Sequence, residues 1–244
     1  MRRLLLYISL LALPTGLFAD NETQYLQEKL DLLLSQQTAH IKRKNETINQ
    51  IKRGLFTEER ALKRLQTYDL LYQEYYVFQF DSAMIYLDKG ITLAEKTANT
   101  YYYNNNLIHK AELLSIGGLY GEAIETMSLV DTTALDNTQK FDFYFSIFRI
   151  HTYWADFCND QKYAPIHREK AKQALIKAMD YCDETAKTYE YYYGEYCVFV
   201  LNDPKKARLH YLKAIHQLPS HSRFFAMACF ALSGNYANEG RTDQ

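Results

Sequence analysis

The most constraining feature of the sequence is a recurring set of small residues. A small residue followed four and seven positions later by a larger side chain and by another small or apolar one begins at Ala83, Ala123, Ala171 and Ala207. These starting points are 40, 48 and 36 residues apart, which is typical of helix-pair repeats with insertions. A small residue lets two helix axes approach closely, and the larger one fills the space between repeats. The pattern therefore predicts stacked antiparallel helix pairs.

Turn-forming residues are too rare for most other folds. The 244 residues include 9 Gly and 4 Pro, less than half of the usual share of about 12%, which leaves little turn chemistry for a barrel or sandwich. Gly118 and Gly240 are predicted to mark turns inside helix pairs.

The fourth unit matches the second half of the tetratricopeptide repeat (TPR) pattern at Ala207, Tyr211, Ala214 and Pro219. We therefore expect an all-α, TPR-like superhelix of antiparallel helix pairs.

Short acidic and proline motifs predict two helix starts. Asp203 and Pro204 are typical of an N-cap followed by proline at the first helical position. Asp81 and Ser82 are likewise predicted to cap the helix that follows them.

The first 19 residues resemble a secretory signal peptide. A basic start at Arg2 and Arg3, a short apolar run and the small residue Ala19 are its usual parts, and the apolar run is shorter than a membrane span of about 20 residues. We expect cleavage after Ala19 and export to the periplasm, with an uncleaved anchor as the alternative. No second apolar run reaches spanning length, so no membrane span is expected after cleavage.

Charge argues against nucleic-acid binding. Loss of the leader leaves 26 basic side chains facing 29 acidic ones, a net charge of −3. Nucleic-acid-binding proteins usually carry a basic stripe and a high pI. We therefore expect no nucleic-acid contact by this segment.

Three segments are expected along the chain: a signal peptide over 1–19, an amphipathic, coiled-coil-like N-terminal helix over 20–56, and TPR-like repeats over 57–244 with an incomplete last repeat. The chain stops at Gln244, directly after a stretch that resembles the first helix of another pair. We expect the native protein to continue beyond it, the alternative being a short protein with a frayed end.

Residues 26–55 have apolar positions at mixed three-, four- and seven-residue spacing, which predicts one long amphipathic helix or two helices. The seven-residue step through Leu34, Ile41, Ile48 and Leu55 allows a short coiled coil and a dimer through this segment. Packing against the next helix is the alternative.

No catalytic, metal or cofactor site is predicted. The sequence has no GxSxG, HExxH or phosphate-loop pattern, and its cysteines, Cys158, Cys182, Cys197 and Cys229, lack the CxxC spacing of zinc and redox sites. We expect all four cysteines to be buried free thiols. If any pair forms a disulfide, Cys182 and Cys197 are the best candidates. Asp and Glu alternate with Lys on predicted helix surfaces, so no carboxyl with a raised pKa is expected. The chain is therefore expected not to be an enzyme.

Tyrosine clusters are the candidates for ligand binding. They lie in segments predicted to form the first helix of a pair, which lines the concave side of a right-handed stack. Consecutive helical residues point about 100° apart, so each triplet should place one ring in the core, one between repeats and one toward the groove. Such a groove can hold an extended peptide or a glycan, and the alternative is that most rings pack between repeats. The candidates are Tyr101, Tyr102, Tyr103, Asn105, Tyr191, Tyr192, Tyr193 and Tyr196.

The mature chain resembles a known family, with the familiar stretch running from Leu30 to Lys96. The stretches 41–46, 48–52, 68–75 and 78–83, followed by Leu93-Ala94, are similar to the N-terminal region of bacterial exported TPR-type regulators. In that family an exported helical-repeat domain is followed by one transmembrane helix, a coiled coil and a cytoplasmic helix-turn-helix region. The resemblance implies a sensory or scaffolding role and no catalytic residue.

We therefore expect a non-enzymatic periplasmic module that recognises a peptide, protein or glycan in its concave groove. It would be the sensor part of a membrane-spanning transcriptional regulator. The alternative is a periplasmic scaffold for envelope protein assembly without signalling.

Overall fold

The computed structural model of this protein describes residues 16–56 and 58–238. Most of the expected signal peptide, residues 1–15, and the predicted turn residue Gly240 lie outside these ranges. The chain divides into two compact units, Met1–Thr57 and Glu58–Gln244. Among the described residues, no helix combines the length and apolar character that crossing a membrane requires.

The N-terminal unit consists of two helices in sequence, α2 (Gly16–Ser35) and α3 (Gln37–Leu55). They meet at Gln36, whose backbone is itself close to helical. Five leucines of α2 are more than half exposed: Leu26, Leu30, Leu32, Leu33 and Leu34. The dimer through residues 26–55 stays a prediction.

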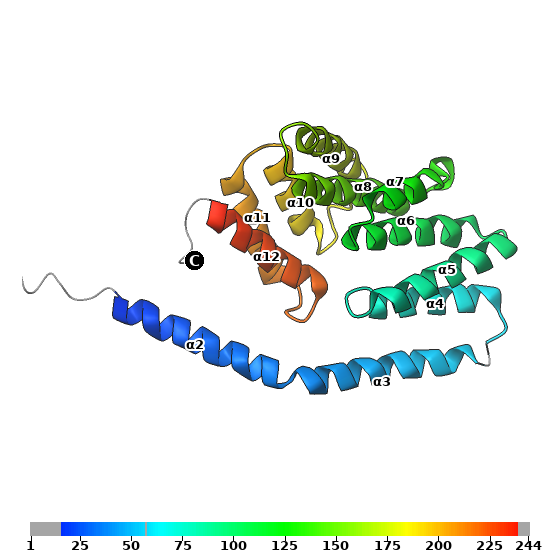
Figure 1. Cartoon of the computed structure of the whole chain (residues 1–244), viewed down its shortest axis with the longest axis horizontal. Coiled ribbons are helices and arrows are strands. Elements are labelled where there is room, and N and C mark those ends of the chain that lie inside the picture. The colour runs from blue at the N-terminus through cyan, green and yellow to red at the C-terminus, as the bar shows by residue number, and fades with distance from the viewer. Residues whose placement is uncertain (1–15, 57, 239–244) are drawn as a thin grey trace, which may run out of the picture. The chain divides into compact units, whose positions relative to one another are not determined.

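The second unit is a series of helix pairs (Figure 1). The first helices of the pairs, here called A helices, are α4 (Ala61–Tyr75), α6 (Thr100–Ile116), α8 (Asn137–Cys158), α10 (Tyr189–Phe199) and α12 (Arg223–Asn238). The second, or B, helices are α5 (Phe80–Lys96), α7 (Tyr120–Ser128), α9 (Ala164–Met179) and α11 (Pro204–Gln217), and a 3₁₀ turn, η1 (Thr132–Ala134), precedes α8. Each A helix from α4 to α10 packs on the B helix that follows it, and α12 packs on α11. The all-α prediction is confirmed.

The recurring small residues lie where B helices meet their neighbours. Ala83, Ala123, Ala171 and Ala207 fall on α5, α7, α9 and α11, and each is at most 1% exposed. The larger residues four positions later, among them Tyr211 at 2% exposure, are buried as well. The repeat spacing in the sequence is thus the spacing of the B helices.

Helix ends follow the local sequence in part. Asp203 caps α11 by accepting a hydrogen bond from the amide of Lys206, with Pro204 at the helix start. The predicted cap at Asp81 is wrong: α5 begins earlier, after Gln79, and Asp81 lies in its first turn. An acidic residue there still favours the helix through its dipole.

Four residues with positive φ lie at the turns after helices α5, α6, α8 and α10: Ala98, Gly118, Asn159 and Asn202, with φ between 41° and 79°. The left-handed conformation reverses the chain after a helix and is easiest for Gly and Asn. Gly118, at φ 79°, thus lies in the turn between α6 and α7.

Two glycines allow helices to approach closely. A Cβ built at Gly90 on α5 would lie 2.7 Å from the Asn106 amide on α6. A Cβ at Gly194 on α10 would overlap the ring of Tyr211 on α11. Neighbouring helices therefore use the missing side chain as packing space.

The core runs continuously through α8. One buried cluster contains Leu107, Ala123 and Met127 of the second pair, and another contains Ala171 and Tyr211 of the third and fourth pairs. Tyr144 and Ile147 of α8 pack against both clusters. The single helix α8 thus joins the two halves of the repeat unit.

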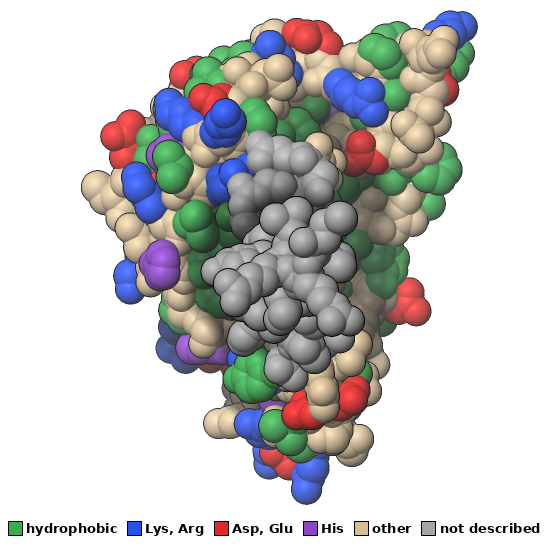
Figure 2. All heavy atoms as spheres, turned by 90° about the vertical axis from the view of Figure 1, so that its left-hand side faces the viewer, with side chains coloured by type: hydrophobic (Ala, Val, Ile, Leu, Met, Phe, Trp, Pro, Cys, Tyr) green, Lys and Arg blue, Asp and Glu red, His purple; other side chains and the backbone are tan. Residues whose placement is uncertain are grey.

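All four cysteines are free thiols, and only Cys197 is fully buried. The expectation of four buried thiols is therefore wrong for Cys158, Cys182 and Cys229, which are half-buried. On the face shown in Figure 2, Lys and Arg side chains are interspersed with Asp and Glu.

We predict that Gly194→Ala lowers the free energy of unfolding by about 1–3 kcal/mol, because the added methyl group forces the Tyr211 ring to move. The matched control is Gly121→Ala in α7, where an added Cβ meets nothing within 4 Å. Alanine should leave stability there unchanged or raise it by less than about 1 kcal/mol. Urea denaturation of both variants checks the expectation, and equal effects would contradict the close approach.

Candidate functional site

Side chains at four A helices meet in one cluster that is buried except at Arg223. Here called the central ionic cluster, it consists of Tyr76 beside the end of α4, Glu112 of α6, Arg149 and Tyr153 of α8, and Arg223 of α12. Arg149 donates to Glu112 and, at 2.6 Å, to the Tyr153 hydroxyl. Tyr76 donates its hydroxyl proton to Glu112 at 2.7 Å. Since B helices contribute nothing to these contacts, the A helices face a common interior.

The carboxylate of Glu112 is the centre of this cluster. Burial by itself raises the pKa of Glu112, but the Arg149 charge, the Tyr76 hydrogen bond and Arg223 together hold it below its usual value. The Glu112 and Arg149 side chains are 14% and 12% exposed. A buried charge needs this degree of compensation because it has lost its water.

Arg223 links the two ends of the series of pairs. Its guanidinium donates to the Tyr76 hydroxyl at 2.9 Å and lies 3.5 Å from Glu112. It also lies 4.1 Å from the centre of the Tyr76 ring, in cation–π geometry. The start of α12 is thereby tied to the end of α4, 147 residues earlier. The Arg223 side chain is 41% exposed, so it is the member of the cluster most open to a ligand.

A second polar group lies between α4 and α6. His109 stacks on Tyr72, with ring centres 4.7 Å apart, and its Nδ1 is 3.6 Å from Asp69. Burial lowers the pKa of His109, although the negative charge of Asp69 opposes the shift. Asn105 donates to the same Asp69 carboxylate at 3.5 Å.

Two further carboxyl groups have raised pKa values. Burial raises the pKa of Asp142 on α8 to about 6, with the charges of Glu112 and Asp136 adding to the effect. Burial raises the pKa of Glu195 on α10 to about 7, against a hydrogen bond from Tyr211 and the charge of Arg149. The expectation that no acid has a raised pKa is therefore wrong. Asp142 lies between Phe141 and Phe143, and Glu195 directly precedes Tyr196 in a tyrosine-rich stretch. That aromatic setting is the signal that could have found them.

The first tyrosine triplet divides between surface and core. Tyr101 is 48% exposed, and its ring packs against Tyr102 with centres 5.2 Å apart. Burial raises the pKa of Tyr101, and the charge of Asp136, followed by those of Asp69 and Asp142, adds to the effect. Tyr103 packs against the core cluster of the second pair. We call Asp69, Tyr101, Tyr102, Asn105 and Asp142 the tyrosine patch.

The neighbouring asparagines have structural roles. Asn104 is buried and exchanges two hydrogen bonds with the backbone of Asp131, which holds the loop before η1. Asn106 is buried and donates to the Tyr102 carbonyl. Asn105 alone of the three is half exposed.

The second tyrosine triplet packs mostly between helices. Tyr191 is 6% exposed and contacts Tyr211 and Phe224. Tyr192 packs on aromatic rings of α8 and α12. Tyr193 stacks on Tyr196, and its hydroxyl accepts a hydrogen bond from Lys206 of α11. Of these four rings, Tyr192 lies within reach of the tyrosine patch, because the Asp142 charge adds to burial in raising its pKa.

Sequence reasoning missed the central ionic cluster. Arg149 is the single Lys or Arg between Phe141 and Trp154, a mostly aromatic and aliphatic stretch. An arginine in such a helix is a sign of a buried ion pair, but its partner Glu112 comes from another helix and cannot be read locally. In the described part of the chain, no three His, Cys, Asp or Glu side chains are placed to hold a metal ion.

Comparison with known proteins agrees with this architecture. The family model described as the SusR N-terminal TPR domain matches residues 34–244. No curated protein matches the chain. TPR domains mediate protein–protein interactions and are generally not catalytic, and the pairing of α4 to α12 follows the same repeat design.

We predict that Arg149→Met lowers the free energy of unfolding by about 3–5 kcal/mol, because it leaves the Glu112 carboxylate buried without its main counter-charge. Arg223→Met should cost less than about 1 kcal/mol, since a half-exposed ion pair contributes little. The double variant Arg149→Met/Glu112→Gln should recover much of the loss. Chemical denaturation tests all three, and equal losses for the two arginines would refute a buried pair.

We also predict a pH effect from Glu195. Its pKa of about 7 in the folded chain exceeds the value of about 4.3 for an unfolded chain. The folded state therefore binds the proton more tightly, so this contribution to stability is full below about pH 4 and is lost as the pH rises through 7. Glu195→Gln should reduce the fall in unfolding free energy between pH 5 and 8 by about 2–3 kcal/mol. An unchanged pH slope, measured by urea denaturation, would contradict the raised pKa.

Proposed function

The chain belongs to the SusR N-terminal TPR domain family, and from this premise we propose that it recognises a ligand on its A helices as the sensor part of a membrane-spanning transcriptional regulator. The expected signal peptide supports a periplasmic location for this domain. The ligand is a peptide, protein or glycan.

The observation that carries this proposal is the tyrosine patch. It combines a half-exposed ring at Tyr101, the carboxyls of Asp69 and Asp142, and the Asn105 amide within one region of the A helices. Aromatic faces and fixed hydrogen-bonding groups together orient ligands in binding sites. Carboxyl groups favour ligands that donate hydrogen bonds, such as sugar hydroxyls or peptide amides and amines.

The central ionic cluster gives the patch a rigid support. Glu112 fixes α4, α6, α8 and α12 to one another through charged hydrogen bonds, which are stronger than neutral ones. A ligand that engages the patch and the half-exposed Arg223 would thus act on both ends of the repeat series. This coupling is what a sensor requires, because binding must change a distant part of the chain.

The test starts from a panel of neutral and acidic oligosaccharides and short peptides, screened for a rise in melting temperature. Hydrogen exchange with each binder should show protection at 101–109 and around Asp142. The double variant Tyr101→Ala/Tyr102→Ala should weaken binding by about tenfold or more, as expected for loss of aromatic contacts. The matched control is Tyr163→Ala, which removes a ring that is 52% exposed outside the patch. Equal affinity of the double variant and wild type, or protection confined to another surface, would refute the proposal.

A further inference from the structure

A hollow lies between α8 and α9, in a different place from the tyrosine patch. It has a volume of about 290 Å³ and is lined by residues of these two helices alone. Its floor is apolar, formed by Ile147 and the buried Ala174, with Tyr144 and His151 along the α8 side. α7, at nine residues the shortest B helix, contributes no lining residue and does not close the hollow.

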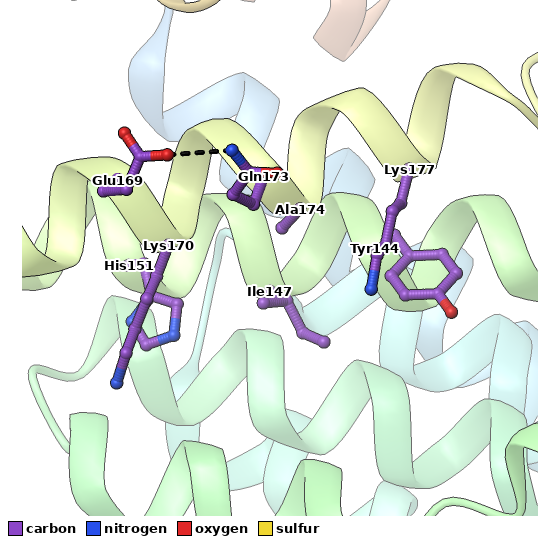
Figure 3. A pocket seen from close by; sticks show the side chains of 8 residues that line it. All are labelled: Tyr144, Ile147, His151, Glu169, Lys170, Gln173, Ala174 and Lys177. Carbon is purple, nitrogen blue, oxygen red and sulfur yellow. Dashed lines mark hydrogen bonds between the residues drawn. The ribbon is translucent and has the colours of Figure 1, made fainter.

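Two lysines of α9 frame this floor. Figure 3 shows Lys170 and Lys177 extending to the two sides of Ile147. They are seven residues apart, which is two turns or about 10 Å along the helix. Lys177 lies 5.6 Å from the centre of the Tyr144 ring. Tyr144 and His151 repeat the same seven-residue spacing on α8.

The hollow carries a net positive charge. Its acidic residue, Glu169, accepts a hydrogen bond from Gln173 at 2.8 Å on the α9 side (Figure 3). His151 is buried and its Nδ1 lies 3.1 Å from Nδ1 of His167. Burial lowers the pKa of His151 to about 4, with His167 and Lys170 adding to the effect, so His151 is neutral at pH 7. The two lysines therefore dominate the electrostatics at neutral pH.

From this geometry we infer that the hollow binds an amphipathic helix of a partner protein that carries two acidic side chains seven residues apart with apolar side chains between them. Acidic side chains at that spacing lie on one face of a helix, about 10 Å apart, and so match Lys170 and Lys177. Apolar side chains at intermediate positions would cover Ile147 and Ala174. Laying an apolar helix face into a groove is a common recognition mode.

The distribution of charge in the hollow favours a helix over a small molecule. Enclosed small-molecule sites have volumes of about 300–1,000 Å³ and bury most of the ligand. This hollow lies at the lower limit of that range, and its charges are spread along a helix rather than converging on one point. Lysines two helical turns apart, on either side of an apolar floor (Figure 3), fit a helical segment.

The test uses a labelled synthetic helical peptide with Glu at positions i and i+7 and Leu at i+3 and i+4, titrated with the whole chain by fluorescence anisotropy. A peptide with Lys in place of both Glu is the matched control. We expect saturable binding of the acidic peptide that weakens with added salt, and at least tenfold weaker binding of the Lys peptide. No saturable binding of the acidic peptide, or equal binding of both peptides, overturns the inference.

Charge-reversal variants locate the contact. The double variant Lys170→Glu/Lys177→Glu should lower the affinity for the acidic peptide at least tenfold. It should also restore binding of the Lys peptide. Lys172→Glu/Lys187→Glu makes the same change in net charge outside this hollow, since Lys172 lines a different surface depression of α9, and should leave both affinities unchanged. Circular dichroism verifies that both variants fold.

Other occupants give distinct results. Binding to vesicles of anionic lipid that is lost in Lys170→Glu/Lys177→Glu, without peptide binding, would assign the hollow to a membrane surface and overturn the helix inference. A concentration-dependent dimer abolished by the same variant would assign it to a second copy and overturn it as well. Neither variant touches the tyrosine patch, so failure of this inference leaves the ligand test on Tyr101 and Tyr102 unaffected.

Discussion

Helices of the second unit pack closely at small residues, and this close packing sets where their other side chains lie. Ala83, Ala123, Ala171 and Ala207 are almost completely buried, and Gly194 leaves room for the ring of Tyr211. A larger side chain at these points would force the helix axes apart. Because the pairs stack so tightly, the free faces of the A helices are directed into a common interior, where their polar side chains must satisfy one another.

Glu112 shows how that interior is organised. Its carboxylate is stabilised by Arg149 and Tyr76 against the cost of burial, and Arg223 extends the network to the last described helix. Removing water from charges is unfavourable unless partners replace it. The same dry surroundings raise the pKa values of Asp142 and Glu195, which lack a comparable counter-charge. The interior thus combines a compensated charge cluster with acids that keep their protons more readily.

Helix α8 gives the molecule two surfaces of opposite character. One side of the helix carries Asp142 and Arg149, which belong to the tyrosine patch and the central ionic cluster. Another side carries Tyr144 and His151, which line the hollow beside the lysines of α9. Since α8 also packs against both core clusters, a single helix positions an acidic, hydrogen-bonding surface and a basic, partly apolar one. The two proposed contacts therefore differ in ligand chemistry while sharing one support.

The helical class, the pairing of helices and some of the turns between them could be read from the sequence. The spacing of small residues, Gly118 and Asp203 carry this information because they act through neighbouring residues. Local spacing also identified the tyrosine triplets as parts of A helices. The packing of the helices, in contrast, buries Tyr191 and leaves Tyr101 accessible, and it places Asn104 where it supports a loop. It alone brought Arg149, Glu112 and Arg223 together, because burial and charge pairing depend on helices far apart in the chain and leave no periodic signal in the sequence.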